Sequence, residues 1–272
     1  MRGSRDVMWY DICKQTTAST MRRTLKVARM ALATAMIFAS PDLSIAQSMQ
    51  PSRPNSSPVT PLRTKDMWLP HTVSRVRPST STVDVIMLHF CSDVVNNPDN
   101  PYNPARIAET FTKAKVSAHY LIDRDGLVHN FVPEERIASH AGRGSLPWFP
   151  DRVNGMNEHS IGIEMLNVGS KADMLIFMKP DKYDEFKRKH PDWVGYTDAQ
   201  YRALNQLIGG IRARHSIPFD RAHIVGHSEY AGRNRRTDPG ELFDWARIGL
   251  PKERPQFVKP SGDTVTSAAV GR

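Results

Sequence analysis

The strongest constraint on the fold is an almost wholly apolar run at residues 83–90, Val-Asp-Val-Ile-Met-Leu-His-Phe. Its β-forming composition suits a strand buried on both faces. Residues 159–167, His-Ser-Ile-Gly-Ile-Glu-Met-Leu-Asn, predict a second strand. A sheet with buried faces needs helices to cover it, so the two runs favour a layered α/β fold.

In the rest of the sequence, helix caps, turn dipeptides and apolar periodicity predict helices and strands that follow one another along the chain. The first is a helix from Asn103-Pro104 to about Lys115, followed by a hairpin of residues 118–124 and 127–132 around Asp125-Gly126. A second helix begins at the Thr197–Gln200 capping box. A strand at 223–226 and a closing helix at 241–248 complete the prediction. Residues 171–195 carry many charges without a clean period, which indicates an insertion or a long loop. The prediction is one α/β domain with a central mixed β-sheet flanked by helices.

Residues 1–46 resemble a secretory signal peptide. Four basic residues between 22 and 29 precede ten largely apolar residues at 30–39, and Ser44-Ile45-Ala46 is a small-residue cleavage pattern. We expect cleavage after Ala46, with Met21 as an alternative start; an amphipathic N-terminal helix is the competing interpretation. A spanning helix needs about 20 apolar residues, so no stable transmembrane anchor is expected.

Composition divides the rest of the chain. Residues 47–64 are rich in Pro, Ser and Thr and predict a disordered linker, 65–250 form the folded domain, and 251–272 form a second disordered tail. The chain has only two cysteines, which excludes a disulfide scaffold.

The net charge is +9, but residues 1–46 hold seven basic and three acidic residues. Without them the charge falls to +5, from 30 basic and 25 acidic residues, with no dense basic run. We therefore do not expect a nucleic-acid partner.

Three polar residues stand where predicted strands end or turns begin. His89 closes the first apolar strand, His227 follows Val225-Gly226, and Asp238 lies in an Arg-Thr-Asp-Pro-Gly turn. Two imidazoles and one carboxylate are suitable zinc ligands that leave a fourth position open. Ten histidines make coincidence easy, so core or loop histidines remain the alternative.

Glu164 is the one acidic residue in the second apolar strand. Ile161 and Ile163 face one way, whereas Gly162 and Glu164 face the other. A carboxylate there is costly to bury unless it is paired or solvated by a cleft. It is a candidate general base, unless that face of the strand is exposed to solvent.

Several ordered motifs together resemble the zinc-dependent N-acetylmuramoyl-L-alanine amidases of the type 2 amidase family, which share a fold with phage amidase-type lysozymes and peptidoglycan recognition proteins. The matching stretches are 116–126, 139–142, 157–164, 196–201, 225–228 and 235–240. The Thr-Asp-Pro-Gly and Phe-Asp-Trp-Ala endings look most like the bacterial muropeptide amidases. The resemblance covers roughly residues 83–250.

The resemblance implies one Zn²⁺ per chain on His89, His227 and Asp238, with Glu164 acting on the attacking water. A cation two residues before the aspartate is usually Lys in the family and is Arg236 here, which leaves its geometry open. It further implies that Tyr120 assists at the site, or is a half-buried strand aromatic. His140 and Asn157 are implied as substrate-binding cleft residues, with loop packing as the alternative.

The implied activity is hydrolysis of the amide between the lactyl group of N-acetylmuramic acid and L-alanine in peptidoglycan or muropeptides. Export to the periplasm, the cell envelope or the medium fits such a substrate. The alternative is a non-catalytic peptidoglycan-binding module of the same fold.

Overall fold

The structure of the protein is a computed structural model that describes residues 61–254. The predicted signal peptide, the predicted linker up to residue 60 and the tail beyond residue 254 lie outside the described residues. Regular elements begin at Thr64 and end at Ile248.

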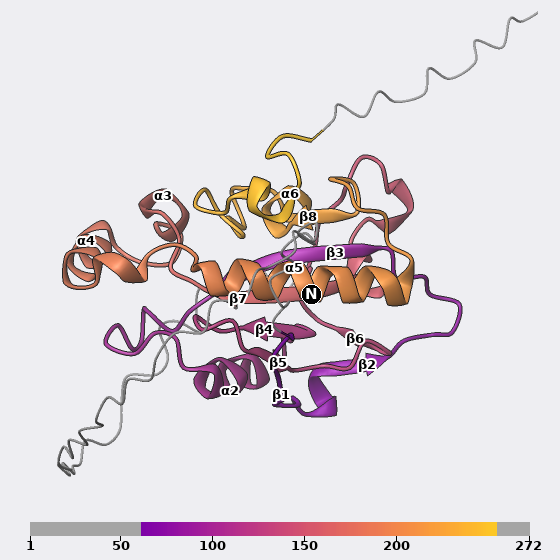
Figure 1. Ribbon diagram of the computed structural model, residues 1–272, viewed down its shortest axis with the longest axis horizontal. Helices are drawn as coiled ribbons and strands as arrows, with labels where there is room; N and C mark the ends of the chain where they lie inside the picture. Colours follow the sequence, from indigo (N-terminus) through magenta and orange to yellow (C-terminus); the bar gives the residue numbers. More distant parts are fainter. Residues whose placement is uncertain (1–60, 255–272) are drawn as a thin grey trace, which may run out of the picture. The chain divides into compact units, whose positions relative to one another are not determined.

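A mixed β-sheet forms the centre of the described domain, as the sequence predicts (Figure 1). In spatial order its strands are β1 (Thr64–Asp66), β5 (Val128–Asn130), β4 (Tyr120–Ile122), β7 (Ser160–Leu166), β3 (Val85–Cys91) and β8 (Ile224–Gly226). Only β4 and β5 pair antiparallel; the other neighbours run parallel. The predicted hairpin and both apolar strands are confirmed. A separate antiparallel pair joins β2 (Ser74–Val76) to β6 (Arg136–Ala138).

The two faces of the sheet are covered by different parts of the chain. Helix α5 (Asp198–His215) opens with the predicted Thr197–Gln200 capping box and packs on one face, against Ile86 and Leu88 of β3 (Figure 1). The opposite face carries Val85, Met87, His89 and Cys91 of the same strand, because strand residues alternate in direction. Every functional candidate on β3 and β7 therefore points away from α5.

Helix α2 (Pro104–Ala114) packs on the face opposite α5. The Asn103 side chain accepts the Ala105 and Arg106 N–H groups and starts the helix where the sequence predicts it. Short elements complete the connections: η1 (His71–Val73), η2 (Pro150–Arg152), η3 (Met156–Glu158) and α6 (His227–Ala231).

Two local predictions are wrong. Of the two interpretations of residues 171–195, the long loop is wrong, because they form α3 (Lys171–Met174), α4 (Pro180–Lys189) and η4 (Pro191–Trp193). Helix α4 buries only Tyr183 and Phe186, so it has too few apolar positions to show a period. The expected closing helix at 241–248 is only the 3₁₀ helix η5 (Trp245–Ile248), which ends after one turn at Gly249.

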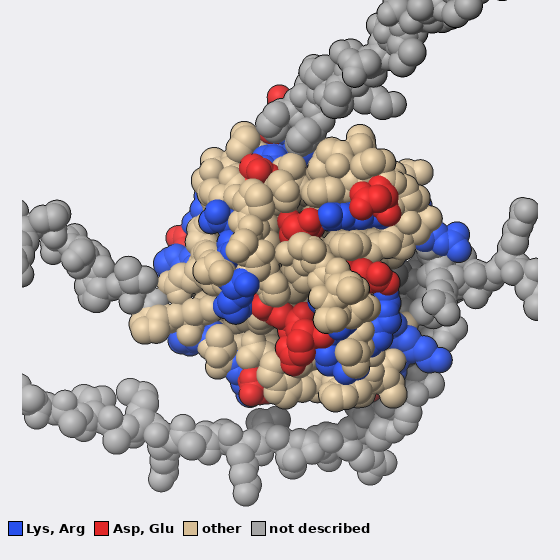
Figure 2. Space-filling model, turned by 90° about the vertical axis from the view of Figure 1, so that its right-hand side faces the viewer, with Lys and Arg blue, Asp and Glu red and all other residues tan. Residues whose placement is uncertain are grey.

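The surface of the domain mixes both signs of charge. On the face shown in Figure 2, small groups of acidic side chains lie beside groups of basic ones, among neutral side chains. Within residues 61–254, no helix combines the length and apolar character that crossing a membrane requires.

Candidate metal centre and catalytic site

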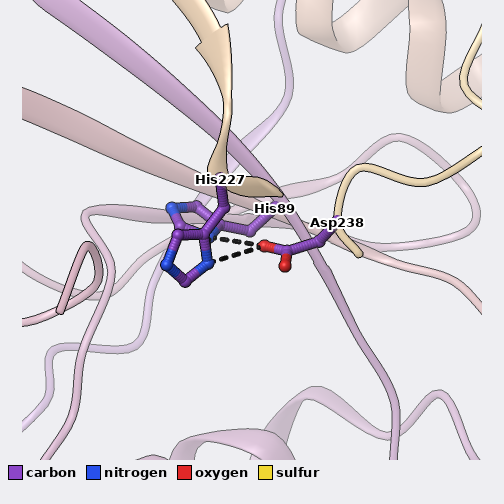
Figure 3. A group of neighbouring side chains, drawn as sticks. All are labelled: His89, His227 and Asp238. Carbon is purple, nitrogen blue, oxygen red and sulfur yellow. Dashed lines mark hydrogen bonds and ion pairs between the residues drawn. The ribbon is translucent and has the colours of Figure 1, made fainter. Parts of the chain in front are cut away.

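Three buried donor groups converge at the carboxyl edge of the sheet. The Nδ1 atoms of His89 and His227 lie 2.8 and 3.0 Å from Oδ2 of Asp238, and 3.1 Å from each other (Figure 3). The three side chains are at most 10% exposed. The structure thus brings together the three residues that the sequence offered as metal ligands.

Strand topology explains the meeting of residues 138 positions apart. β3 and β8 are parallel neighbours, with Leu88 opposite Gly226, so His89 and His227 each follow at the same edge. Asp238 lies on a loop, and its own backbone carbonyl accepts the Ser228 N–H at 2.9 Å. Gly226 permits this approach, because a Cβ there would lie 2.6 Å from Cδ of Pro239.

The donor set fits a zinc ion. Ligands around tetrahedral zinc stand about 3.3 Å apart, which is a few tenths of an ångström more than the separations found here. Burial lowers the pKa of His89 to about 4, so its imidazole is neutral and has a lone pair to offer at neutral pH. Burial alone would raise the pKa of Asp238, but the neighbouring His227 and His89 bring it below its ordinary value.

Glu164 lies on β7 directly opposite His89 of β3. Its side chain is buried, which removes the solvent-facing alternative. Burial, together with the nearby Asp238 charge, raises the pKa of Glu164 to about 8. Its Oε2 atom is buried without a hydrogen-bond partner among the described residues. An uncompensated carboxylate of this kind would be stabilised by a nearby cation.

A small hollow connects these groups. Its volume is about 40 Å³, and its walls include the three converging residues together with Glu164, His140, Arg236 and Phe177. About one probe sphere of 10–15 Å³ is needed per water, so the hollow can hold an ion with a few waters but not a sugar ring. A large substrate would lie across its mouth.

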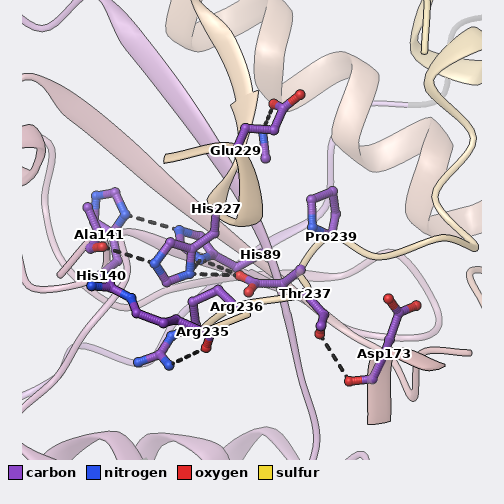
Figure 4. A network of polar contacts seen from close by, with 12 residues as sticks. His89, His140, Ala141, Asp173, His227, Glu229, Arg235, Arg236, Thr237 and Pro239 are labelled. Atoms are coloured by element: carbon purple, nitrogen blue, oxygen red, sulfur yellow. Dashed lines mark hydrogen bonds and ion pairs between the residues drawn. The ribbon is translucent and has the colours of Figure 1, made fainter. Parts of the chain in front are cut away.

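Arg236 lies on the loop that carries Asp238 and lines the same hollow. Its Nη1 donates to the Arg235 carbonyl at 2.8 Å, which turns the guanidinium back over its own loop (Figure 4). The side chain is only half-buried. A positive group in this place could donate to an oxygen that gains negative charge.

The structure does not bring Tyr120 to the site. In β4 the residue beside Glu164 is Leu121, so Tyr120 points to the opposite face and packs near α5. Its hydroxyl donates to Glu134 at 2.6 Å. This is the half-buried strand aromatic that the sequence left as the alternative, because register fixes the face of each residue.

The two predicted cleft residues have different surroundings. Asn157 accepts the backbone N–H groups of His140 and Ala141 at 3.0 and 2.8 Å, which is a loop-packing role. His140 lines the hollow, but its Nδ1 lies 3.0 Å from Nε2 of His89. It therefore contacts a candidate metal ligand directly.

Sequence reasoning missed the contribution of the segment from 170 to 177. Phe177 lines the hollow from the predicted insertion. Asp173 is fully buried and binds the loop that carries Asp238. Its Oδ2 accepts the Glu241 N–H at 2.9 Å, and its carbonyl accepts the Thr237 hydroxyl at 3.1 Å (Figure 4). The Ser170-x-x-Asp173 capping pattern was the available signal.

Comparison with known proteins places the site in context. Residues 79–241 match the family described as N-acetylmuramoyl-L-alanine amidase. The 1,6-anhydro-N-acetylmuramyl-L-alanine amidase AmpD of Citrobacter freundii is 35% identical over 134 residues, which are 49% of this chain and 56% of that protein. The AmpD of Haemophilus influenzae is 29% identical over 184 residues, covering 63% of this chain and 83% of that one. The chain thus spans little more than half the length of the first of these relatives.

A solved structure supports the architecture. The crystal structure of a selenomethionine AmpD derivative superposes with a TM-score of 0.50 and 25% identity, covering 71% of this chain and 96% of that one. The central mixed sheet with flanking helices is therefore an architecture that this solved structure shares.

Proposed function

This chain belongs to the N-acetylmuramoyl-L-alanine amidase family, and on that premise we propose that it hydrolyses the amide between the lactyl group of N-acetylmuramic acid and L-alanine. The substrate would be peptidoglycan or its muropeptide fragments, including the 1,6-anhydro forms for which its relatives are named. The observation that carries the proposal is the convergence of His89, His227 and Asp238 beside the buried Glu164.

We propose that the cofactor is one zinc ion on His89, His227 and Asp238. When bound, zinc would polarise the scissile carbonyl and lower the pKa of a water molecule. Its positive charge would also oppose the burial that raises the pKa of Glu164 to about 8. Glu164 would then be ionised at neutral pH, which a general base requires.

The chain's own residues would move the protons and stabilise the charge. Glu164 would accept a proton from the attacking water and return it to the amine of the leaving L-alanine, as one positioned carboxyl can do in both steps. Arg236 would donate to the carbonyl oxygen as its negative charge develops. The small volume of the hollow supports a substrate that lies across its mouth and inserts only the amide.

The test is mass spectrometry of products from whole sacculi and from purified 1,6-anhydro-muropeptides, with added zinc and with a chelator. We expect release of stem peptides that begin with L-alanine, and no release after chelation. The variant Glu164→Gln should retain zinc and lose a factor of about 10²–10⁴ in turnover, the usual contribution of a general base. Binding of sacculi without release of peptide would instead support the non-catalytic binding module.

We further propose that the protein is exported. The basic stretch, the short apolar run and the small residues before Ala46 support this proposal. The periplasmic or secreted protein should then begin at Gln47, which N-terminal sequencing can measure. Recovery of the chain from the cytosol, still starting at Met1 or Met21, would contradict export.

A further inference from the structure

A chain of hydrogen bonds reaches His89 at Nε2, the ring nitrogen that does not face Asp238. Oγ of Ser160 donates to the Met156 carbonyl at 2.7 Å and lies 3.2 Å from Nε2 of His140. Nδ1 of His140 lies 3.0 Å from Nε2 of His89, on the side of that ring that faces away from Asp238 (Figure 4). The chain therefore runs from the backbone of η3 through two side chains to a proposed metal ligand.

Counting hydrogens along this chain fixes the tautomers. The single hydroxyl hydrogen of Ser160 is used on Met156, so Ser160 must accept a hydrogen from Nε2 of His140. A neutral imidazole carries one N–H, which leaves Nδ1 of His140 as an acceptor. His89 must then donate from Nε2, and its Nδ1 presents a lone pair toward Asp238.

His227 reaches the same state through the adjacent residue. Its Nε2 donates to the Ala141 carbonyl at 2.9 Å, which leaves Nδ1 as a lone pair 3.0 Å from Asp238 (Figure 4). His140 and Ala141 are held in turn by Asn157, whose side-chain oxygen accepts both of their backbone N–H groups. One short segment therefore orients both imidazoles.

The backbone of β7 at Gly162 fixes the position of the His140 ring. Gly162 follows Ser160 on the same face of β7, and a Cβ at Gly162 would lie 2.5 Å from Cγ of His140. The imidazole therefore lies directly against the strand backbone. Only glycine permits this contact between the strand that carries Glu164 and the ring that supports His89.

We propose that His140 is a positioning residue that, with Ser160, holds His89 in the tautomer that presents Nδ1 to the metal. The inference rests on the metal site of the proposed function and concerns residues to which sequence reasoning gave a different role or none. Partners of this kind typically change metal affinity by 10–100-fold when removed. His140 also lines the hollow, so direct contact with substrate is the competing role.

Zinc affinity of the metal-free full chain, measured without substrate by competition with a chromophoric chelator, separates the two roles. We expect His140→Leu to weaken zinc binding 10–100-fold. His140→Asn should stay within a few-fold of the wild type, because its side-chain oxygen can replace Nδ1 as the acceptor. Ser160→Ala should weaken binding by a few-fold, and it serves as the test if His140→Leu does not fold. The control is Ser139→Ala, on the same segment and lining the same hollow, which should leave zinc affinity unchanged.

Imidazole nitrogen NMR of the metal-free protein gives a second readout. His140→Leu should raise the fraction of His89 that is protonated at Nδ1 above that of the wild type, because Asp238 then competes for the proton without opposition from His140. Wild-type zinc affinity and an unchanged His89 tautomer in His140→Leu would overturn the inference. Failure of the wild type to bind zinc would instead refute the metal site of the proposed function, so the two failures are distinguishable.

Discussion

Glu164 and Arg236 show how differently two residues of one site are supported. Glu164 lies on a central strand, is buried, and is fixed opposite His89 by backbone pairing. Arg236 lies on a loop, is half-buried, and rests on the carbonyl of its own neighbour. The rigid group suits proton transfer, which depends on distance, whereas the looser cation suits long-range charge stabilisation.

Two substitutions of Arg236 therefore separate the effect of its positive charge from the effect of its guanidinium shape. Arg236→Ala should lower kcat by about 10²–10³, because one donor to a developing oxyanion is lost. Arg236→Lys should stay within about tenfold of the wild type, since a compact cation can serve the same oxygen. Steady-state kinetics on a muropeptide at saturating zinc measures both, and an unchanged kcat in Arg236→Ala would remove this residue from the mechanism.

Single residues also show where sequence reasoning ends. The residue types at positions 89, 227 and 238 are suitable for metal binding, but the pairing of β3 with β8 and the approach of the Asp238 loop to Gly226 are what put their atoms within 3.1 Å. The resemblance leaves Tyr120 either at the site or as a half-buried strand aromatic. Its face depends on the register with β7, which a single strand sequence does not reveal.

Among the elements, helix α3 has only four residues, but it contacts the loop that carries Asp238. Asp173 caps the helix through Ser170 and also binds the loop that carries Asp238. A buried carboxylate with several donors connects residues 171–195 to the candidate metal centre. The sequence showed this segment only as charged and aperiodic, because its helices bury few side chains.

Asp173→Ala should lower the free energy of unfolding by about 1–3 kcal/mol, since it removes a buried acceptor and leaves the partly buried Ser170 and Glu241 N–H groups without it. It should also weaken zinc binding, because the loop of Asp238 loses its anchor. Urea unfolding and zinc titration measure these effects. The control is Glu185→Ala, an exposed carboxylate of α4 that pairs with Lys182, expected to cost less than about 0.5 kcal/mol. Equal effects of the two variants would contradict the anchoring role.

Glu134 joins the last turn of α5 to the segment after β5. It accepts two hydrogen bonds from Arg214 and one each from His215 and Tyr120. Burial opposes ionisation, but the Arg214, Tyr120 and His215 hydrogen bonds outweigh it and lower the pKa of Glu134 to about 2. The ionised carboxylate thus stabilises the folded state above its unfolded pKa of about 4.3, and this contribution is lost as pH falls toward 2.

Glu134→Gln should therefore lower the free energy of unfolding by about 1–3 kcal/mol at neutral pH. The difference from the wild type should shrink as pH falls below about 4.3, because the wild-type carboxylate is then protonated more in the unfolded state. Urea unfolding from pH 7 to about pH 3 measures this. Glu135→Gln, at the exposed neighbour, is the control, and a pH-independent difference in Glu134→Gln would refute the assignment.

At the scale of the whole molecule, the proposed metal ligands join distant parts of the chain. His89 lies near the end of the central strand β3, whereas His227 and Asp238 belong to the C-terminal part of the domain. The layered architecture was predictable because two apolar strands require cover on both faces. The closing 3₁₀ helix was not, because Trp245 and Ile248 satisfy the spacing of either helix type and Gly249 alone ends the turn.

Zinc should therefore stabilise the entire domain. At a free concentration about 1,000 times its Kd, a ligand that binds only the folded state contributes about 4 kcal/mol. For a domain of this size that corresponds to a rise in Tm of about 8–16 °C. Thermal unfolding with zinc and with chelator measures the rise, and His89→Ala should show none. An equal response in that variant would mean that zinc acts elsewhere.

The division of the site between strands and a loop has a consequence for protein engineering. Glu164, the proposed general base, and His89 belong to buried central strands of the sheet, so substitutions there also lower the stability of the fold. Thr237 and Asp238 are buried, and the Thr237 hydroxyl donates to the carbonyl of Asp173 in α3, whereas the next helix, α4, buries only Tyr183 and Phe186. Libraries that diversify the exposed positions of α4, while leaving the strands, Asp173 and the Arg236–Asp238 loop untouched, are the natural route to variants that accept other cell-wall fragments.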